Sequence, residues 1–222
     1  MSSEPYHRLI LLPGLGADAR MFEAQRVRFP NLEVPDWLTP LQNETLESYG
    51  QRFAESLAYN ANCFIGGSSF GGMLAAEMSK RITPRKLLLI GSACSFSEVT
   101  PLLRAASRLA RWMPKSVCRL NIMPTRLTTR LFGLQTDSQR HLFEEMASAA
   151  SPEFIRWGIQ AMSTWSGMEP DVPVAKLHGV QDRIIPPLND GSQTLIPGAG
   201  HLPTMSHPNE VNDWLASVLA SS

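Results

Sequence analysis

Short runs of apolar residues alternate along the chain with longer segments whose apolar residues recur at helical spacing. A run of apolar residues bounded by glycine or proline is typical of a strand that is buried on both faces of a sheet. The sequence predicts six such strands, at 7–12, 31–35, 63–67, 86–90, 174–178 and 193–196. Helices are predicted at 18–28, 45–59, from 70 onward and at 209–220, and in the first of them Met21, Phe22 and Val27 are expected to face the core. Strands that alternate with helices predict an α/β fold, with a parallel sheet covered on both faces.

One interval interrupts this alternation. Residues 92–172 are rich in helix formers and contain no strand candidate, and four prolines divide them into four or five predicted helices. The interval is too long for a simple crossover between two strands. We therefore expect one domain that spans 1–222, with 92–172 inserted as a helical layer over one end of the sheet. The four prolines are Pro101, Pro114, Pro124 and Pro152.

Composition narrows the class of protein. The chain has 222 residues, 43% of them hydrophobic, which is enough for one sizeable core, and its formal net charge is zero. A neutral balance gives no support for broad nucleic-acid binding. The three cysteines lack metal-ligand and C-x-x-C spacing, as expected of buried thiols in a reducing compartment. The sequence shows no signal-peptide pattern and no apolar stretch of about 18 residues, so we expect a cytoplasmic protein without a membrane span.

The turn between the third strand and the helix after it carries the motif G-x-S-x-G, at residues 67–71. Such a strained corner presents a serine hydroxyl free of its neighbours, and the flanking glycines are needed because a Cβ there would collide with the crossing backbone. Ser68 is a competing serine, but the residue two positions after it is Phe70 instead of glycine. Ser69 is therefore the candidate nucleophile.

A serine nucleophile needs a base, and the five histidines differ in their suitability. His201 follows the sixth strand, at the edge of a parallel sheet where Ser69 also lies, and it is the candidate base. The alternative for His201 is a loop histidine with no catalytic partner. His178 lies inside or at the end of a strand, which favours a satisfied core histidine. The remaining histidines lie before the first strand, on a polar helical stretch and at the start of the last helix: His7, His141 and His207.

The acid that orients the base is expected at the end of the preceding strand. Asp182 lies there, and it gives the chain order Ser69, Asp182, His201 that accompanies this serine motif. In the alternative interpretation, Asp182 forms an Asx turn or an ion pair with Arg183. The nearby acids that fit this place less well are Asp190, Asp171 and Glu169.

Backbone N–H groups are expected to bind the oxyanion that develops on the substrate. The N–H of Phe70 lies at the positive end of a helix, and the N–H of Leu15 lies in the glycine-rich loop 13–16 after the first strand. The G-x-G pattern of the same loop has a rival interpretation as part of a dinucleotide-binding motif. Its third glycine position is Ala19, and Asp36 is the acidic residue at a plausible spacing for a ribose contact.

Together these features resemble the α/β-hydrolase family: the glycine-rich loop, the serine motif, Gly179-x-x-Asp182 followed by Pro186, and Gly200-His201. The resemblance covers nearly the whole chain. It implies a doubly wound, mostly parallel sheet of about six strands, with the second strand outermost and the first beside the third. It also implies that 92–172 is a helical cap that roofs the pocket and selects substrates.

The resemblance further implies a serine hydrolase that needs no metal and no cofactor. A serine nucleophile implies carboxylic esters or thioesters with a small to medium acyl group as substrates, cleaved through an acyl-enzyme. The same catalytic triad of serine, aspartate and histidine also serves acyltransferases and perhydrolases of this family. The alternative from another class is a ligand-binding receptor or scaffold of the same fold with little turnover.

A basic helical face lies within 92–172. Four basic residues recur there at i, i+4, i+7 and i+11: Arg104, Arg108, Arg111 and Lys115. One interpretation is a solvated outer face that balances acidic residues elsewhere. The other is a dock for an acidic partner, such as a carrier protein that bears an acyl thioester, or for an anionic substrate group.

Overall fold

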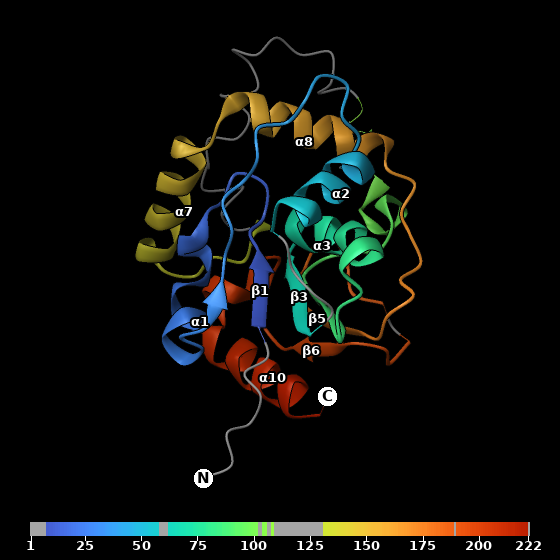
Figure 1. The fold of residues 1–222 in the computed structure, drawn as a ribbon. Coiled ribbons are helices and arrows are strands. Elements are labelled where there is room, and N and C mark those ends of the chain that lie inside the picture. The colour runs from blue at the N-terminus through green and yellow to red at the C-terminus, as the bar shows by residue number, and fades with distance from the viewer. Residues whose placement is uncertain are drawn as a thin grey trace.

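A six-stranded parallel sheet forms the centre of the molecule (Figure 1). The computed structural model describes residues 8–57, 62–101, 104–105, 108, 131–188 and 190–221. The strands lie in the order β2-β1-β3-β4-β5-β6, and every neighbouring pair is parallel. The predicted fold class is therefore confirmed, with β2 outermost and β1 beside β3. The strands are β1 (Arg8–Leu12), β2 (Leu32–Glu33), β3 (Cys63–Ser68), β4 (Lys86–Ile90), β5 (Val174–Gly179) and β6 (Thr194–Ile196).

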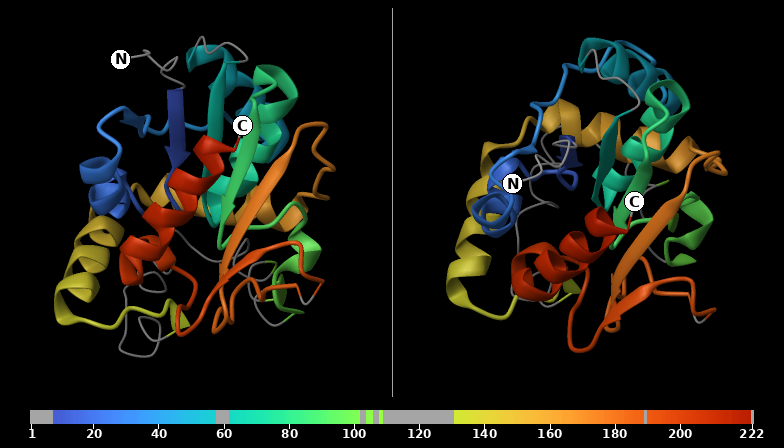
Figure 2. Two further views of the ribbon diagram at one scale, coloured as in Figure 1. Left: turned by 90° about the horizontal axis from the view of Figure 1, so that it is seen from below. Right: turned by 60° about the horizontal axis from the view of Figure 1, so that its bottom comes forward.

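Each face of the sheet has its own apolar core. Alternate residues of a strand point to opposite faces, so Ile10 of β1 belongs to one core and Leu11 to the other. Helices cover both faces, and on the second face α1 and α10 pack side by side (Figure 2). The helices of the first face are α2 (Leu46–Leu57) and α3 (Phe70–Ile82); those of the second are the 3-10 turn η1 (Ala19–Phe22), α1 (Glu23–Arg28), α9 (Pro203–Ser206) and α10 (Pro208–Ala220).

The segment predicted as one helix at 18–28 consists of η1 followed by the short helix α1. A 3-10 turn has fewer residues per turn than an α-helix, so the change of type shifts the phase of the side chains. Met21 and Phe22 are buried as predicted, but Val27 is 81% exposed and the prediction for it is wrong. Gln25 faces inward instead, where its side-chain amide donates a hydrogen bond to a backbone carbonyl of α9.

The described part of 92–172 contains helices and no strand. The last of these helices, α8, lies across the end of the sheet at which β1 and β3 finish (Figure 1). Its start is fixed by Ser151, whose hydroxyl accepts a hydrogen bond from the N–H of Phe154, and by Pro152 in the first turn. Among the described residues, no helix is both long and apolar enough to cross a bilayer. The elements of this interval are η2 (Phe96–Glu98), α7 (Asp137–Ala149) and α8 (Pro152–Thr164).

A substitution in the middle of β3 tests how closely the central strands pack. A Cβ on Gly66 would lie 2.1 Å from the carbonyl oxygen of Leu88 in β4, which is part of the sheet backbone. We expect Gly66→Ala to lower the free energy of unfolding by at least about 3 kcal/mol, because the clash cannot be relieved without separating two strands. Urea unfolding measures this change.

The matched control is Gly191→Ala. No atom of the described residues lies within 4 Å of the added Cβ there, so only the positive φ of 75° opposes the substitution. This control should cost about 1 kcal/mol. Equal losses for the two variants would contradict close packing between β3 and β4.

Candidate active site

The turn between β3 and α3 holds Ser69 in a strained conformation, with φ 53° and ψ −120°. A side chain on either flanking glycine would collide with backbone: a Cβ on Gly67 would lie 2.5 Å from the carbonyl oxygen of Leu12, and one on Gly71 would lie 2.1 Å from the same atom. The end of β1 therefore passes directly beneath the turn. The N–H of Ser69 donates to the carbonyl of Ile90 at 3.1 Å, which ties the turn to β4 as well.

Three of the predicted site residues meet at this edge of the sheet. The Ser69 hydroxyl lies 2.8 Å from Nε2 of His201, and Nδ1 of the same ring lies 2.8 Å from Oδ2 of Asp182. His201 and Asp182 are both buried. The loops after β3, β5 and β6 supply one residue each, because parallel strands end at a common edge.

Asp182 is held as a carboxylate. Its burial alone would raise its pKa, but the charge and hydrogen bond of His201 oppose this effect, as do the N–H groups of Ile184 and Ile185, which donate to Oδ1 at 2.8 and 3.0 Å. The net result is a pKa below the ordinary value of an aspartate. A charged Asp182 fixes the proton of His201 on Nδ1, which leaves Nε2 to accept the proton of Ser69.

Close contacts of Gly133 and Gly179 with Gly200 position the loop that carries His201. A Cβ on Gly133 would lie 2.6 Å from Cα of Gly200, and one on Gly179 would lie 2.3 Å from the carbonyl of the same residue. Next to Gly133, Phe132 accepts a hydrogen bond from the N–H of Leu202 at 3.0 Å, and its ring lies 5.9 Å from the ring of His201. The segment that follows the larger undescribed stretch of 92–172 thus contacts the histidine loop directly.

The two backbone N–H groups predicted to bind an oxyanion flank Ser69. Phe70 is the first residue of α3, and Leu15 lies in a turn closed by a hydrogen bond from the N–H of Ala17 to the carbonyl of Gly14 at 3.0 Å. Within the described part of the chain, neither N–H group donates to a backbone acceptor outside a helix or strand.

Helix α8 packs against both of these residues. A Cβ on Gly158 would lie 2.5 Å from Cδ1 of Leu15, so the leucine side chain rests on the helix backbone. The ring of Phe70 lies 6.1 Å from that of Phe154 and 6.0 Å from that of Trp157, both in perpendicular arrangements that favour aromatic pairs. The helix that covers the site thus also braces the residues that would carry the N–H donors.

A cavity of about 330 Å³ opens at Ser69 and His201. Apart from these two side chains its walls are glycine or apolar, and they include three methionines, whose flexible side chains adapt to ligands of different shape. Residues of the sheet edge form its floor and residues of α7 and α8 form its roof. The lining residues are Gly14, Leu15, Ala17, Met21, Ser69, Met73, Phe96, Val99, Phe132, Phe143, Ile155, Ile159, Met162, Ile184, Ile185, His201 and Leu202.

The other candidate residues lie apart from this cavity. Asp190 is fully exposed and accepts from Ser192, and His141 is exposed and pairs with Glu145. Arg108 is exposed and Arg104 is half-buried. His7, Arg111 and Lys115 lie outside the described residues, so a basic face that runs to Lys115 stays a prediction.

His178 is buried, as the sequence favoured for a core histidine. Neither of its ring nitrogens makes a hydrogen bond of standard geometry with a described residue, but the side chain of Gln193 lies close enough to raise the pKa of the ring. Burial lowers the pKa of His178 to about 4, against the opposing effects of the Asp182 carboxylate and the Gln193 side chain. The imidazole is therefore neutral at pH 7.

Ser92 is a site residue that the sequence analysis missed. It follows β4 at the same sheet edge, its side chain is buried, and its hydroxyl donates a hydrogen bond of 2.6 Å to the carbonyl of Ser69. A Cβ on Gly72 would lie 2.4 Å from this hydroxyl, so the first turn of α3 closes over it. The sequence could have indicated Ser92 only by its position directly after a predicted strand. A lone serine without a motif does not reveal which residue it binds.

Comparison with known proteins places the chain in a family. The sequence profile of the α/β-hydrolase family matches residues 9–214, so the chain belongs to that family. No curated protein sequence matches it. Membership of a hydrolase family supports the general assignment as a hydrolase and leaves the substrate open.

Solved structures share the fold at low sequence identity. An esterase from Thermogutta terrifontis is 21% identical with a TM-score of 0.72, and the match covers 97% of this chain and 90% of that one. An esterase from Exiguobacterium antarcticum is 15% identical with a TM-score of 0.77, covering 97% and 92%. MenH from S. aureus is 14% identical with a TM-score of 0.75, covering 99% and 96%.

The buried neutral imidazole of His178 predicts a pH-dependent stability. The unfolded chain binds a proton at this residue near pH 6.5, whereas the folded chain does so only near pH 4, so stability is lost as the pH falls through this window. Between pH 7 and pH 5 we expect the free energy of unfolding to fall by roughly 2 kcal/mol on this account. Urea unfolding at the two pH values measures the loss.

The variant that tests the source of this loss is His178→Leu, which cannot take up a proton. Its free energy of unfolding should depend on pH distinctly less than that of the wild type, whatever its absolute stability. The control is His141→Gln, which removes an exposed histidine and should keep the wild-type dependence. A wild-type dependence in His178→Leu would refute the assignment.

Proposed function

We propose that this protein is a serine hydrolase that cleaves carboxylic esters or thioesters with a small to medium acyl group. The observation that carries the proposal is the continuous hydrogen-bonded line from Ser69 through His201 to Asp182, with two distances of 2.8 Å. The strained φ of Ser69, its position between strand and helix, and membership of the α/β-hydrolase family support the same conclusion.

The proposed reaction proceeds in two halves. Ser69 attacks the carbonyl carbon while Nε2 of His201 takes the hydroxyl proton, and the N–H groups of Leu15 and Phe70 stabilise the negative charge on the carbonyl oxygen. His201 then passes its proton to the departing alcohol or thiol, which leaves an acyl-enzyme. Water attacks the acyl-enzyme with His201 again as base, and the acid is released as the bond to Ser69 breaks.

The apolar walls of the cavity favour a substrate with an uncharged acyl group. Among the described residues that line it, only Ser69 and His201 carry polar side chains, so a carboxylate or ammonium on the acyl chain would lose its hydration without gaining a partner there. A volume of about 330 Å³ suits a small to medium group. In this proposal 92–172 acts as the cap, through residues of α8 such as Ile155 and Ile159 that line the roof.

Two of the solved structures with a similar fold are esterases, in agreement with this substrate class. All three triad positions hold residues that can perform the chemistry, namely Ser69, Asp182 and His201. This favours an enzyme over a receptor or scaffold with little activity. Acyl transfer and perhydrolysis use the same three residues. We propose hydrolysis, in which water accepts the acyl group. Docking of an acidic carrier protein on the basic face of Arg104, Arg108, Arg111 and Lys115 stays a prediction of the sequence.

Two adjacent serines provide a matched test of the nucleophile. With p-nitrophenyl esters from acetate to decanoate, we expect Ser69→Ala to lower kcat by at least about a thousandfold, as loss of a triad nucleophile does. Ser68→Ala should change kcat by less than about twofold, because its buried hydroxyl has no hydrogen-bond partner among the described residues. Comparable losses in the two variants would show that Ser69 is not the nucleophile.

The hydrogen bond from Ser92 to the carbonyl of Ser69 predicts a smaller effect on catalysis. Ser92→Ala removes one buried hydrogen bond that orients the turn, so kcat should fall by about tenfold, with little change in KM because Ser92 does not line the cavity. Steady-state kinetics on the best ester separates the two constants. A rise in KM with unchanged kcat would contradict a role in orienting Ser69.

A further inference from the structure

The turn that contains Leu15 is held in place from outside. The N–H of Ala17 donates to the carbonyl of Gly14, and Gly16 has a φ of 81°, as the third residue of a type II turn requires. One internal hydrogen bond fixes the shape of a turn, but it does not fix where the turn lies relative to Ser69. That position depends on contacts with elements that are distant in the sequence.

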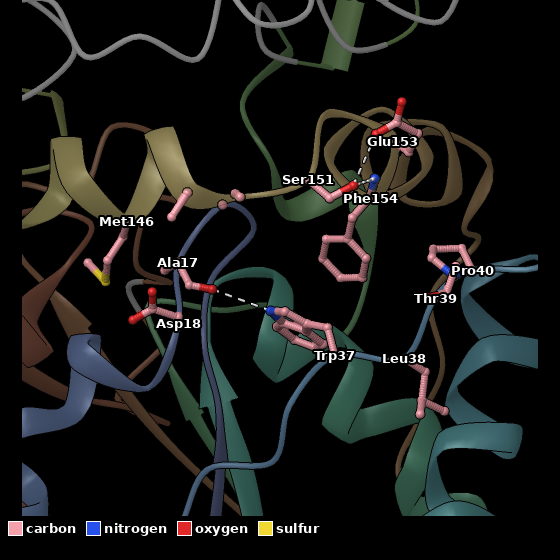
Figure 3. A pocket seen from close by; sticks show the side chains of 13 residues that line it. Ala17, Asp18, Trp37, Leu38, Thr39, Pro40, Met146, Ser151, Glu153 and Phe154 are labelled. Atoms are coloured by element: carbon pink, nitrogen blue, oxygen red, sulfur yellow. Dashed lines mark hydrogen bonds between the residues drawn. The ribbon is translucent and has the colours of Figure 1, made fainter.

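Trp37 makes one of these contacts, from the loop between β2 and α2. Its indole N–H points at the end of the turn and donates to the carbonyl of Ala17 at 3.3 Å (Figure 3). The side chain of Trp37 thus binds the last residue of the turn through a backbone atom.

The ring of Trp37 packs against three other aromatic rings. Phe53 of α2, Phe70 of α3 and Phe154 of α8 lie 6.0, 5.8 and 5.0 Å from it between ring centroids. A side chain that is packed on several sides loses rotamer freedom. The direction of the indole N–H is therefore fixed by the aromatic contacts.

Trp37 joins the two elements that carry the proposed oxyanion donors. Its hydrogen bond reaches the turn of Leu15, and its ring contacts Phe70, the first residue of α3. Donors stabilise a developing negative charge best when they are already in position, so a small displacement of either one raises the barrier. Trp37 does not line the cavity at Ser69, so it acts on the donors without contacting an acyl group there.

A second side chain contacts the same turn but is less suited to this role. Sδ of Met21 accepts a hydrogen bond from the N–H of Gly14 at 3.5 Å. A thioether sulfur is a weak acceptor, and Met21 also lines the cavity, so its effects on the turn and on substrate binding coincide. Trp37 provides the stronger bond, and its effect can be measured separately.

We propose that Trp37 is a positioning residue for the oxyanion site, the pair of N–H groups of Leu15 and Phe70. The indole N–H holds the turn of Leu15, and the ring holds Phe70 at a fixed separation from that turn. Trp37 itself takes no part in proton transfer or bond formation. This inference rests on the proposed hydrolase function, because an oxyanion forms only if Ser69 attacks a carbonyl group.

Removal of the indole N–H tests the role of the hydrogen bond. Trp37→Phe keeps an aromatic ring and loses the donor, so kcat on the best p-nitrophenyl ester should fall at least about tenfold, with KM changed by less than about twofold. Steady-state kinetics on the folded protein separates the two constants. An unchanged kcat, or a loss that appears only in KM, would overturn the proposal.

The matched control is Trp165→Phe. The indole N–H of Trp165 donates to Oε1 of Glu77 at 2.6 Å, both residues are buried, and neither lines the cavity at Ser69. The bond reaches neither proposed donor, so kcat of the folded control should change by less than about twofold, although a buried hydrogen bond is lost. Equal losses of kcat in the two variants would assign the effect to a general loosening of the protein and overturn the proposal.

A transition-state analogue reports on the oxyanion site directly. When a trifluoromethyl ketone with the preferred acyl chain binds, the Ser69 oxygen bonds to the carbonyl carbon, the hydroxyl proton passes to His201, and the carbonyl oxygen becomes an oxyanion. Its inhibition constant should rise in Trp37→Phe by about the factor by which kcat/KM falls, whereas that of the corresponding alcohol, which forms no oxyanion, should stay unchanged. A lowered kcat with an unchanged inhibition constant for the ketone would place the effect elsewhere and overturn the proposal.

A second replacement covers the case in which Trp37→Phe does not fold. Benzothienylalanine in place of Trp37 keeps the shape of the indole and has sulfur where the N–H group was, so the aromatic contacts remain and only the hydrogen bond is lost. It should lower kcat and weaken the ketone as Trp37→Phe does. Full activity in this protein would show that the indole N–H does not position the turn.

The outcomes distinguish this inference from the proposed function. Wild-type protein that neither hydrolyses esters nor binds the ketone would contradict both. Hydrolysis that is lost in Ser69→Ala and kept in Trp37→Phe would contradict the role of Trp37 alone.

Discussion

The structure depends on the close approach of three strand ends beneath one strained turn. The end of β1 lies so near the turn between β3 and α3 that a Cβ on Gly67 or Gly71 would meet the carbonyl of Leu12, and β4 holds the same turn through a hydrogen bond to the N–H of Ser69. A positive φ in a serine is unfavourable, so it persists only where its surroundings leave no alternative. The buried sheet provides that constraint, and it sets the position from which Ser69 faces His201.

The helical interval contributes to the site as well as covering it. Helix α8 supports Leu15 through Gly158 and Phe70 through Phe154 and Trp157, while Phe132 and Gly133 seat the loop of His201. The same segments line the cavity, so the parts that would contact a substrate also position residues of the candidate site. This arrangement couples the shape of the roof to the geometry of the site.

Much of this arrangement could be predicted from the sequence, because each part has a local signal. Apolar runs between glycines and prolines indicate buried parallel strands, and G-x-S-x-G at a strand end indicates a strained serine. The position of His201 and Asp182 after strands then follows from the shared edge of a parallel sheet. The prediction for Val27 failed because a 3-10 turn changes the phase of a helix, which residue types do not reveal.

The long-range contacts could not be predicted from the sequence. The hydrogen bond from Ser92 to Ser69 and the contact between Gly133 and Gly200 each join segments with no shared motif. The pattern of a strand indicates that His178 is buried, and it says nothing of the hydrogen bonds of its ring.

The central claim, that Ser69 is a nucleophile activated by His201, is tested most directly by covalent labelling. The protein is treated with diethyl p-nitrophenyl phosphate, which leaves a stable diethylphosphoryl group on an activated serine, and the modified peptide is identified by mass spectrometry. The account predicts one label, on Ser69, with loss of esterase activity in step with labelling. Labelling of another residue, or full activity in protein labelled at Ser69, would contradict it.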